Sequence, residues 1–194
     1  MDALVLTHGA GADRDAPLLV AVDRAFTVCG IRVSRVDLWF REHRRSGPPF
    51  SGDAAKDRAT LRTHAAQARE QGAERVFLGG HSYGGRQGTM LAAEEPGVAD
   101  ALLLLSYPLH PPRRPDEPRT KHFGLLRTPA FFVHGTRDQF GSIEEMRAAI
   151  ALIPARTAML ECEGAGHDLR AKRREPLEAL AERISREFMS FVDR

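Results

Sequence analysis

The sequence predicts an α/β fold, in which a mostly parallel sheet of about six strands is covered by helices on both faces. Two observations predict it. Short apolar runs alternate with longer stretches of helical spacing, and glycine-rich turns follow several of the apolar runs. At 194 residues, the chain has the length of one domain, so we expect residues 1–194 to form a single domain without a cap domain.

Six short runs rich in Leu, Val, Ile and Phe predict the strands. They are residues 3–7, 31–37, 75–78, 101–107, 129–134 and 157–162. Most of these runs are continuously apolar, as in strands that are buried on both faces. Residues 31–37 alternate between apolar and polar side chains, which predicts a strand with one wetter face.

Apolar spacing and residues typical of helix ends predict the helices. They are residues 17–26, 53–71, 86–95, a segment that begins at 142, and residues 175–192. Gly30 and Gly72 follow the first two, at the place where glycine commonly ends a helix. Ser142 and Glu145 have the spacing of a capping box, which satisfies free N–H groups at the start of a helix.

The composition indicates a soluble globular protein, with 42% hydrophobic and 28% charged residues and a net charge of +2. This balance, with scattered Lys and Arg, gives no reason to expect a nucleic-acid partner. The first residues lack the pattern of a signal peptide, and no run approaches the roughly 20 apolar residues of a membrane span. Cys29 and Cys162 lie in apolar stretches and are expected to be buried thiols. We therefore expect a cytoplasmic protein without a membrane partner.

The pentapeptide Gly80-His81-Ser82-Tyr83-Gly84 lies between an expected strand and an expected helix. In that context a G-x-S-x-G pattern predicts a nucleophile elbow, whereas outside it the same residues are only a glycine-rich turn. The chain must turn sharply at Ser82, and glycine has no Cβ to obstruct the turn. Ser82 is therefore the predicted nucleophile.

Ser82, Asp138 and His167 each follow an expected strand, so a parallel sheet brings them to the same edge. A serine nucleophile needs a base, and the base needs a carboxylate that fixes its tautomer. The order Ser, Asp, His along the chain is that of α/β-hydrolases. We predict a catalytic triad; in the alternative interpretations, Asp138 is a turn residue and His167 an exposed loop histidine. Asp168 and Glu144 are rival acids.

An oxyanion hole needs backbone N–H groups that face the developing charge. The Tyr83 N–H is the first predicted donor. The second is expected from the glycine-rich loop 8–11, where we favour Ala10 over Gly9, although this loop is alternatively a simple tight turn. The two cysteines and eight histidines have no metal-ligand spacing, so neither a metal nor another cofactor is expected.

Several separate motifs resemble one small α/β-hydrolase family without a cap domain. They are residues 6–11, 80–86, 107–112, 119–123 and 135–141. Members are mostly bacterial hydrolases; eukaryotic relatives include the testis-expressed protein 30 type and a subunit of the NSL histone acetyltransferase complex. The sequence is also similar, more loosely, to dienelactone hydrolases. The resemblance covers nearly the whole chain and implies a minimal α/β-hydrolase fold.

Together these features predict a serine hydrolase that cleaves a small ester, thioester or related acyl bond through an acyl-enzyme. The alternative is a non-catalytic binding or scaffold protein of the same fold, as some relatives are, and a lyase or acyl-transfer reaction is a third possibility.

Four further residues are candidates for contact with the substrate: Gly9, His81, Arg113 and Trp39. Arg113 lies in a Pro- and Arg-rich segment, residues 108–123, and either pairs with an anionic substrate or belongs to a solvated loop. Trp39 lies in residues 38–53, which we expect to be an ordered loop, and either forms an apolar wall of the site or packs in the core.

Overall fold

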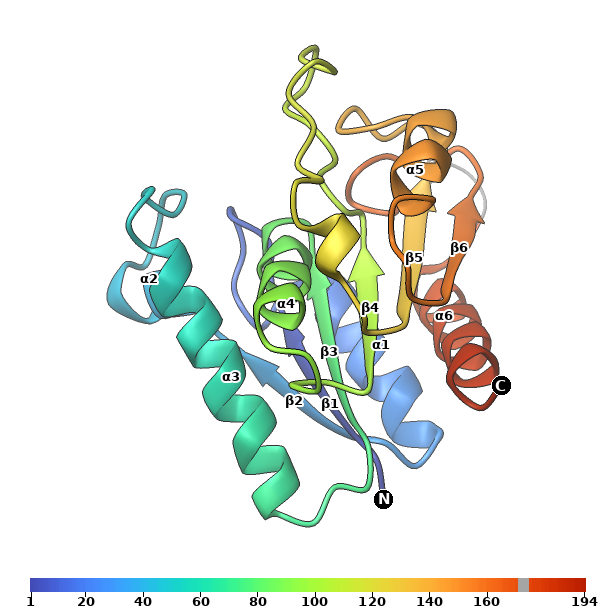
Figure 1. The fold of residues 1–194 in the computed structure, drawn as a ribbon. Helices are drawn as coiled ribbons and strands as arrows, with labels where there is room; N and C mark the ends of the chain where they lie inside the picture. The colour runs from blue at the N-terminus through green and yellow to red at the C-terminus, as the bar shows by residue number, and fades with distance from the viewer. Residues whose placement is uncertain (171–174) are drawn as a thin grey trace.

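A computed structural model describes residues 1–170 and 175–194. Six parallel strands form one sheet in the order β2-β1-β3-β4-β5-β6 (Figure 1). The strands are β1 (Ala3–Thr7), β2 (Arg32–Val36), β3 (Val76–His81), β4 (Ala101–Leu105), β5 (Ala130–Gly135) and β6 (Thr157–Cys162). The predicted α/β fold with about six strands is confirmed.

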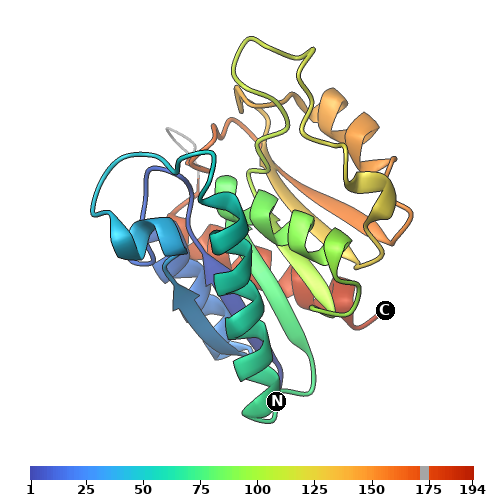
Figure 2. The ribbon, with the colours of Figure 1, turned by 60° about the vertical axis from the view of Figure 1, so that its left-hand side comes forward.

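Helices cover both faces of this sheet, as the two ribbon views show (Figures 1 and 2). They are α1 (Pro17–Val28), α2 (Trp39–His43), α3 (Ala54–Glu70), α4 (Tyr83–Glu94), the short 3₁₀ helix η1 (Phe123–Leu125), α5 (Ile143–Ile150) and α6 (Leu177–Val192). Helices α1 and α6 pack on one face, and α3, α4 and α5 pack on the other. The predicted capping box at Ser142 and Glu145 is present at the start of α5.

Two hydrophobic cores lie on the two faces of the sheet, because successive strand side chains point to opposite faces. On β4, Leu102 and Leu104 pack in the core beneath α3 and α4. Leu103 and Leu105 pack in the core beneath α1 and α6. Each such leucine contributes roughly 1.5–3 kcal/mol when it is fully buried, so the continuously apolar strands stabilise both layers.

The strand order reverses between β1 and β3. The chain leaves β1 toward β2 and then returns past β1 to β3, so the loops that follow β1 and β3 run in opposite directions. Parallel α/β sheets bind ligands at such a point, beyond the carboxyl ends of the strands. These ends lie at the top of Figure 1. The fold thus places residues 8–11 and Ser82 beside the same crevice.

Two expectations about local structure are wrong. Residues 38–53, expected to be an ordered loop, contain α2, a helix of five residues. Such a short helix has no periodic sequence signal and depends on tertiary contacts; the Phe40 N–H donates to the Asp57 carboxylate on α3 at 3.1 Å. Cys29 is exposed rather than buried. It follows the last turn of α1, where the apolar Val28 is also 88% exposed.

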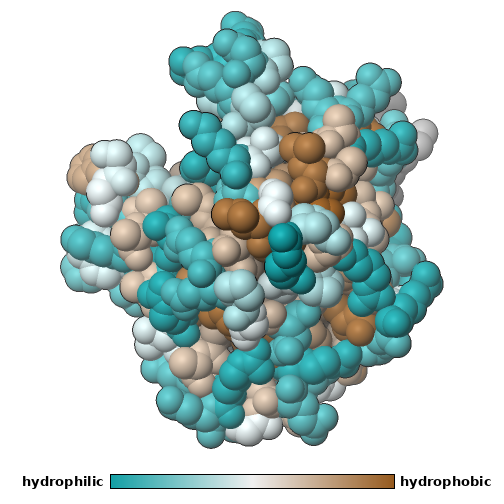
Figure 3. Space-filling model, viewed as in Figure 1, coloured by the Kyte–Doolittle hydropathy of each residue, from teal (hydrophilic) through white to brown (hydrophobic). Residues whose placement is uncertain are grey.

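The β4–β5 connection is the one crossover in residues 1–170 that contains no α-helix, and it carries only η1. In Figure 1 it rises above the carboxyl ends of the strands. Apolar side chains on this face of the molecule gather between this connection and α5, and charged and polar ones cover most of the rest (Figure 3).

Arg75 joins residues from the two ends of the chain at the opposite ends of the strands. The Arg75 guanidinium donates to the Asp2 carboxylate at 2.6 Å and to the Asp193 carboxylate at 2.9 Å. Arg75 directly precedes β3, so this contact lies at the amino ends of the strands. None of the described helices is long and apolar enough to cross a membrane.

Candidate active site

Ser82 occupies a sharp turn between β3 and α4. Its φ of 51° and ψ of −115° lie in a region that a residue with a side chain rarely adopts. The turn is held on both sides: the Ser82 N–H donates to the Leu105 carbonyl at 2.8 Å, and the Arg86 N–H donates to the Ser82 carbonyl at 3.0 Å. Helix α4 therefore begins directly after Ser82, three residues earlier than its sequence pattern predicts.

Two glycines make this turn possible by allowing close backbone contact. A Cβ at Gly80 would collide with the backbone of Gly85 one turn into α4. A Cβ at Gly84 would lie 2.5 Å from the His8 carbonyl oxygen, on the loop after β1. The glycines thus let α4 approach both its own strand and the neighbouring loop.

The structure brings Ser82, His167 and Asp138 together in one hydrogen-bonded chain. Ser82 Oγ lies 2.8 Å from His167 Nε2, and His167 Nδ1 lies 2.8 Å from Asp138 Oδ2. The Asp138 side chain is fully buried, and its other oxygen accepts the Phe140 N–H at 2.9 Å. In this arrangement the carboxylate accepts the Nδ1 proton, so Nε2 is free to accept the proton of the serine hydroxyl.

Close contact between two loops aligns the acid with the histidine. A Cβ at Gly135 would collide with the Ala165 carbonyl, and the Arg137 N–H donates to the same carbonyl at 2.9 Å. The turn after β5 is thereby held against the loop that carries His167. The Phe140 ring lies against the His167 imidazole, with 4.1 Å between the ring centroids.

His81 is placed as a support for His167. Its Nε2 donates to the His167 carbonyl at 2.9 Å, and burial lowers its pKa, which keeps the ring neutral. Its Nδ1 lies against Gly9, 3.0 Å from the position of a Cβ there. The Nε2 atom of this predicted substrate-contact residue is therefore occupied by a protein group, and its Nδ1 lies beside the loop after β1.

The loop after β1 lies directly against Ser82. A Cβ at Gly9 would be 3.5 Å from the Ser82 Cβ. The buried His8 donates from Nδ1 to the Gly9 carbonyl at 2.8 Å and accepts the Leu38 N–H at Nε2, 3.1 Å away. Because burial lowers the pKa of His8, its ring is neutral and can do both.

Fixing the Gly9 carbonyl also fixes the direction of the Ala10 N–H, because the two groups lie on opposite sides of one trans peptide. Arg41 holds the rest of the loop: its guanidinium donates to the carbonyls of Ala10, at 3.1 Å, and Ala12, at 2.8 Å. The loop therefore has a defined shape beside Ser82, as an oxyanion donor requires.

Tyr83 is anchored to α3 through its side chain. Its hydroxyl donates to the Asp57 carboxylate at 2.6 Å, and the other Asp57 oxygen accepts the Phe40 N–H. Burial raises the pKa of both Asp57 and Tyr83. Sequence analysis missed Asp57 because acidic residues are common in polar helices. Asp57 lies one helical turn before Leu61 and two turns before Ala65, on the buried side of α3. This spacing is the sequence feature from which its burial could have been predicted.

His134 is a second residue that sequence analysis missed. It is fully buried on β5, where its Nε2 donates to the Gly141 carbonyl at 2.8 Å. This bond closes the loop that carries Asp138. The apolar run around His134 predicts only a buried strand, so nothing in the sequence separates this histidine from its neighbours.

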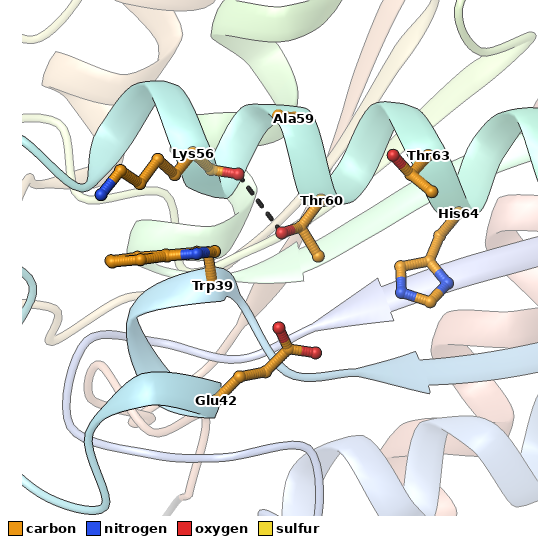
Figure 4. A pocket seen from close by; sticks show the side chains of 7 residues that line it. All are labelled: Trp39, Glu42, Lys56, Ala59, Thr60, Thr63 and His64. Carbon is orange, nitrogen blue, oxygen red and sulfur yellow. Dashed lines mark hydrogen bonds between the residues drawn. The ribbon is translucent and has the colours of Figure 1, made fainter.

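Trp39 and Arg113 lie in other surroundings. Trp39 lines a shallow groove of about 370 Å³ between α2 and α3. Ser82, His167 and Asp138 do not line this groove. Figure 4 shows the Lys56 side chain lying over its indole, with Nζ 3.7 Å from the ring centroid. Arg113 is exposed in a turn closed by a hydrogen bond from the Arg114 N–H to the Pro111 carbonyl. Within the described residues, no group of three or more His, Cys, Asp or Glu is arranged to hold a metal ion.

A family model described as an alpha/beta hydrolase domain matches residues 1–193. The chain belongs to this family. The resemblance to α/β-hydrolases inferred from separate motifs is thereby confirmed, and the described residues have the α/β-hydrolase fold.

Solved α/β-hydrolase-like structures share the fold at low sequence identity. Est1E from Butyrivibrio proteoclasticus, in a structure with ferulic acid, superposes with a TM-score of 0.80 at 16% identity, covering 100% of this chain and 90% of that one. A dienelactone hydrolase from Anabaena variabilis gives 0.75 at 18% identity, covering 98% and 87%. The esterase domain of a Rhodothermus marinus protein gives 0.69 at 17% identity, covering 98% and 88%.

Proposed function

We propose that this α/β-hydrolase is a serine hydrolase that cleaves a small ester, thioester or related acyl bond through an acyl-enzyme. The observation that carries the proposal is the hydrogen-bonded chain from Ser82 Oγ through His167 to Asp138, with 2.8 Å at each step. Membership of a hydrolase family supports it.

In the first half of the reaction, Ser82 Oγ attacks the acyl carbon while His167 Nε2 takes the hydroxyl proton. Asp138 stabilises the resulting imidazolium through the Nδ1 proton. The Tyr83 and Ala10 N–H groups donate to the oxyanion of the tetrahedral intermediate, where each donor contributes about 3–4 kcal/mol. When the intermediate collapses, the bond to the leaving group breaks, and His167 returns the proton to that group.

In the second half, water takes the place of the leaving group. His167 Nε2 accepts a proton from the water as its oxygen attacks the acyl carbon, and the second tetrahedral intermediate uses the same two N–H donors. Collapse breaks the ester bond to Ser82 Oγ, which regains a proton from His167. The products are the free acid and the original enzyme.

The connection between β4 and β5 carries only the short helix η1, which favours small or extended acyl groups over a deep lipid tunnel. The motifs that resemble the testis-expressed protein 30 type and the NSL-complex subunit suggest a finer relationship within the family, which we also propose. A scaffold role, as in some of those relatives, is the alternative.

A fluorophosphonate probe, which reacts with activated serines, tests the proposal. The purified protein is expected to be labelled and to hydrolyse short p-nitrophenyl esters, and Ser82→Ala is expected to lose both. Ser106→Ala is the matched control. Ser106 also follows a strand and also has a positive φ, of 50°, but it is buried. Labelling that persists in Ser82→Ala would exclude this mechanism. A folded wild-type protein with neither labelling nor turnover would favour the scaffold alternative.

A further inference from the structure

Arg86 carries a charge that the described residues do not balance. It lies one helical turn after Ser82 on α4 and is only partly exposed. Its Nε is buried and has no hydrogen-bond partner within the described residues. Nearby arginines of α3 differ, because Arg58 pairs with Glu94 and Arg62 pairs with Glu95.

Arg119 brings a second such charge to the same region from the segment after β4. Its backbone is fixed, because its carbonyl accepts the Tyr107 hydroxyl at 2.7 Å and its N–H donates to the Leu109 carbonyl at 2.7 Å. Its guanidinium donates to the Pro108 carbonyl at 3.2 Å. The ion pairs that the described residues form include neither Arg119 nor Arg86, whereas Arg114 on the same segment pairs with Glu117.

A side-chain hydrogen bond joins the two segments beside these arginines. Thr89 Oγ1 donates to the Arg86 carbonyl at 2.8 Å, and it accepts the Nε2 proton of His122 at 2.8 Å. Helix α4 also packs against η1, which follows His122 directly. Arg86 and Arg119 therefore belong to two fixed segments that touch.

Burial, and after it the nearby positive charge, lowers the pKa of two neighbouring groups. Burial lowers the pKa of Arg119, and Arg86 lowers it further. Burial, then Arg86 and Arg58, lower the pKa of His122 to about 4, so this histidine is neutral near pH 7. Two arginines that are only partly exposed thus lie on segments that touch, and neither has a carboxylate partner within the described residues.

We propose that Arg86 and Arg119 form a subsite for an oxyanion group, a carboxylate or a phosphate, on the molecule that binds beside Ser82. Partly buried charges are costly unless they are paired, and a carboxylate or phosphate accepts hydrogen bonds from guanidinium groups in a matched geometry. Arg86 is one turn from the nucleophile, so the anionic group lies a short distance from the acyl carbon. Where it names a substrate, the proposal rests on the proposed function: the substrate is an acyl compound with a second, anionic end.

Binding without catalysis provides the first test. Ser82→Ala protein is titrated with succinate and, separately, with inorganic phosphate by calorimetry at constant ionic strength. We expect saturable binding of at least one anion and a weakening of about tenfold or more when Arg86→Gln or Arg119→Gln is added, as for hydrogen bonds to charged groups. The two anions distinguish a carboxylate from a phosphate site. Ser82→Ala/Arg127→Gln is the control, because Arg127 is exposed on the same connection.

Saturable binding that is unchanged in both arginine variants would overturn the proposal, as would the absence of binding of either anion to folded protein. Circular dichroism and thermal unfolding establish that each variant is folded. Anion binding that depends on both arginines, together with a folded wild-type protein that hydrolyses no ester, would support the subsite and contradict the proposed hydrolase function. The experiments can therefore contradict the anion subsite and the hydrolase function independently of each other.

Turnover provides the second test. The p-nitrophenyl monoester of adipic acid and the corresponding methyl diester differ only in the distal carboxylate. We expect Arg86→Gln and Arg119→Gln to lower the ratio of kcat/KM for the acid over the diester about tenfold or more, mainly through KM. Arg86→Lys is expected to retain most of the ratio, and Arg127→Gln all of it. The same ratio in wild type and in both glutamine variants would contradict the proposal.

Discussion

The Tyr83 hydroxyl donates a 2.6 Å hydrogen bond to the buried carboxylate of Asp57. The residue after Ser82, whose N–H is the first predicted oxyanion donor, is thus fixed by a residue of α3, which lies 26 positions earlier in the sequence and is separated from α4 by β3. Asp57 also accepts the Phe40 N–H, so one carboxylate joins α2, α3 and α4. The backbone around Ser82 depends on this buried contact.

Removing the Asp57 carboxylate is expected to destabilise the protein and impair the site together. Asp57→Ala leaves the Tyr83 hydroxyl and the Phe40 N–H without their partner, at a cost of about 1–3 kcal/mol for each unsatisfied group. Urea unfolding measures this loss. Asp57→Asn, which keeps an acceptor and the same shape, is expected to recover most of it; an equal loss in both variants would contradict a hydrogen-bonding role.

Two glycines of α4 are expected to respond in opposite directions to the same change. Gly84→Ala places a Cβ 2.5 Å from the His8 carbonyl and is expected to cost about 2 kcal/mol or more in unfolding free energy. At Gly88 a Cβ meets nothing within 4 Å, so Gly88→Ala is expected to stabilise the helix by about 0.5–1 kcal/mol. Thermal or urea unfolding of the two variants decides whether glycine is needed at position 84 because of the close backbone contact, and not because of helix propensity.

Asp138→Asn tests the role of the acid. An amide favours the wrong histidine tautomer, so kcat for ester hydrolysis is expected to fall by about 10⁴ while the fold is retained. Asp168→Asn is the matched control, because Asp168 adjoins His167 in sequence but its carboxylate accepts the Arg170 N–H at 3.1 Å. If Asp168→Asn lost activity and Asp138→Asn kept it, the assignment of the acid would be wrong.

His81 is expected to act through the position of His167. His81→Ala removes the donor to the His167 carbonyl and is expected to lower kcat about tenfold with little change in KM, since a modest misplacement of the base slows the chemical step. His81→Gln can place an amide N–H near the former Nε2 and is expected to restore part of the rate. A change confined to KM would instead indicate that His81 contacts the substrate.

His122 is expected to make stability depend on pH. Its pKa is about 4 in the folded protein and 6.5 as the reference value, so between these values the unfolded state binds more protons. Stability is therefore present above pH 6.5 and is lost as the pH falls toward 4. At about 1.4 kcal/mol per pKa unit, reduced by solvent screening of a partly exposed ring, the loss is roughly 2 kcal/mol.

Urea unfolding at pH 7 and at pH 4 measures this effect in wild type and in His122→Gln, whose amide can still donate to Thr89. The variant is expected to lose less stability than wild type over that interval. His43→Gln, on the exposed surface of α2, is the control and is expected to follow wild type. Equal losses in all three proteins would show that His122 does not titrate as expected.

The meeting of Ser82, His167 and Asp138 was predictable from the sequence, whereas the contacts of the residues around them were not. Ser82, Asp138 and His167 are predictable because each follows an apolar run, and a parallel sheet collects such positions at one edge. Asp57 and His134 lie inside elements, and their roles depend on which residue of another element faces them. Helix α2 was not predicted for the same reason. A helix of five residues is too short to show a helical period of apolar residues, and α2 is held by a tertiary contact instead.

The contact of Arg75 with both Asp2 and Asp193 has a practical consequence for engineering. Residues 2 and 193 both bind Arg75 at the amino ends of the strands, whereas Ser82 lies at the carboxyl ends, so a peptide linker between them would close the chain into a ring without approaching the candidate site. An immobilisation tag at either present end would likewise leave the Ser82 edge facing the solution.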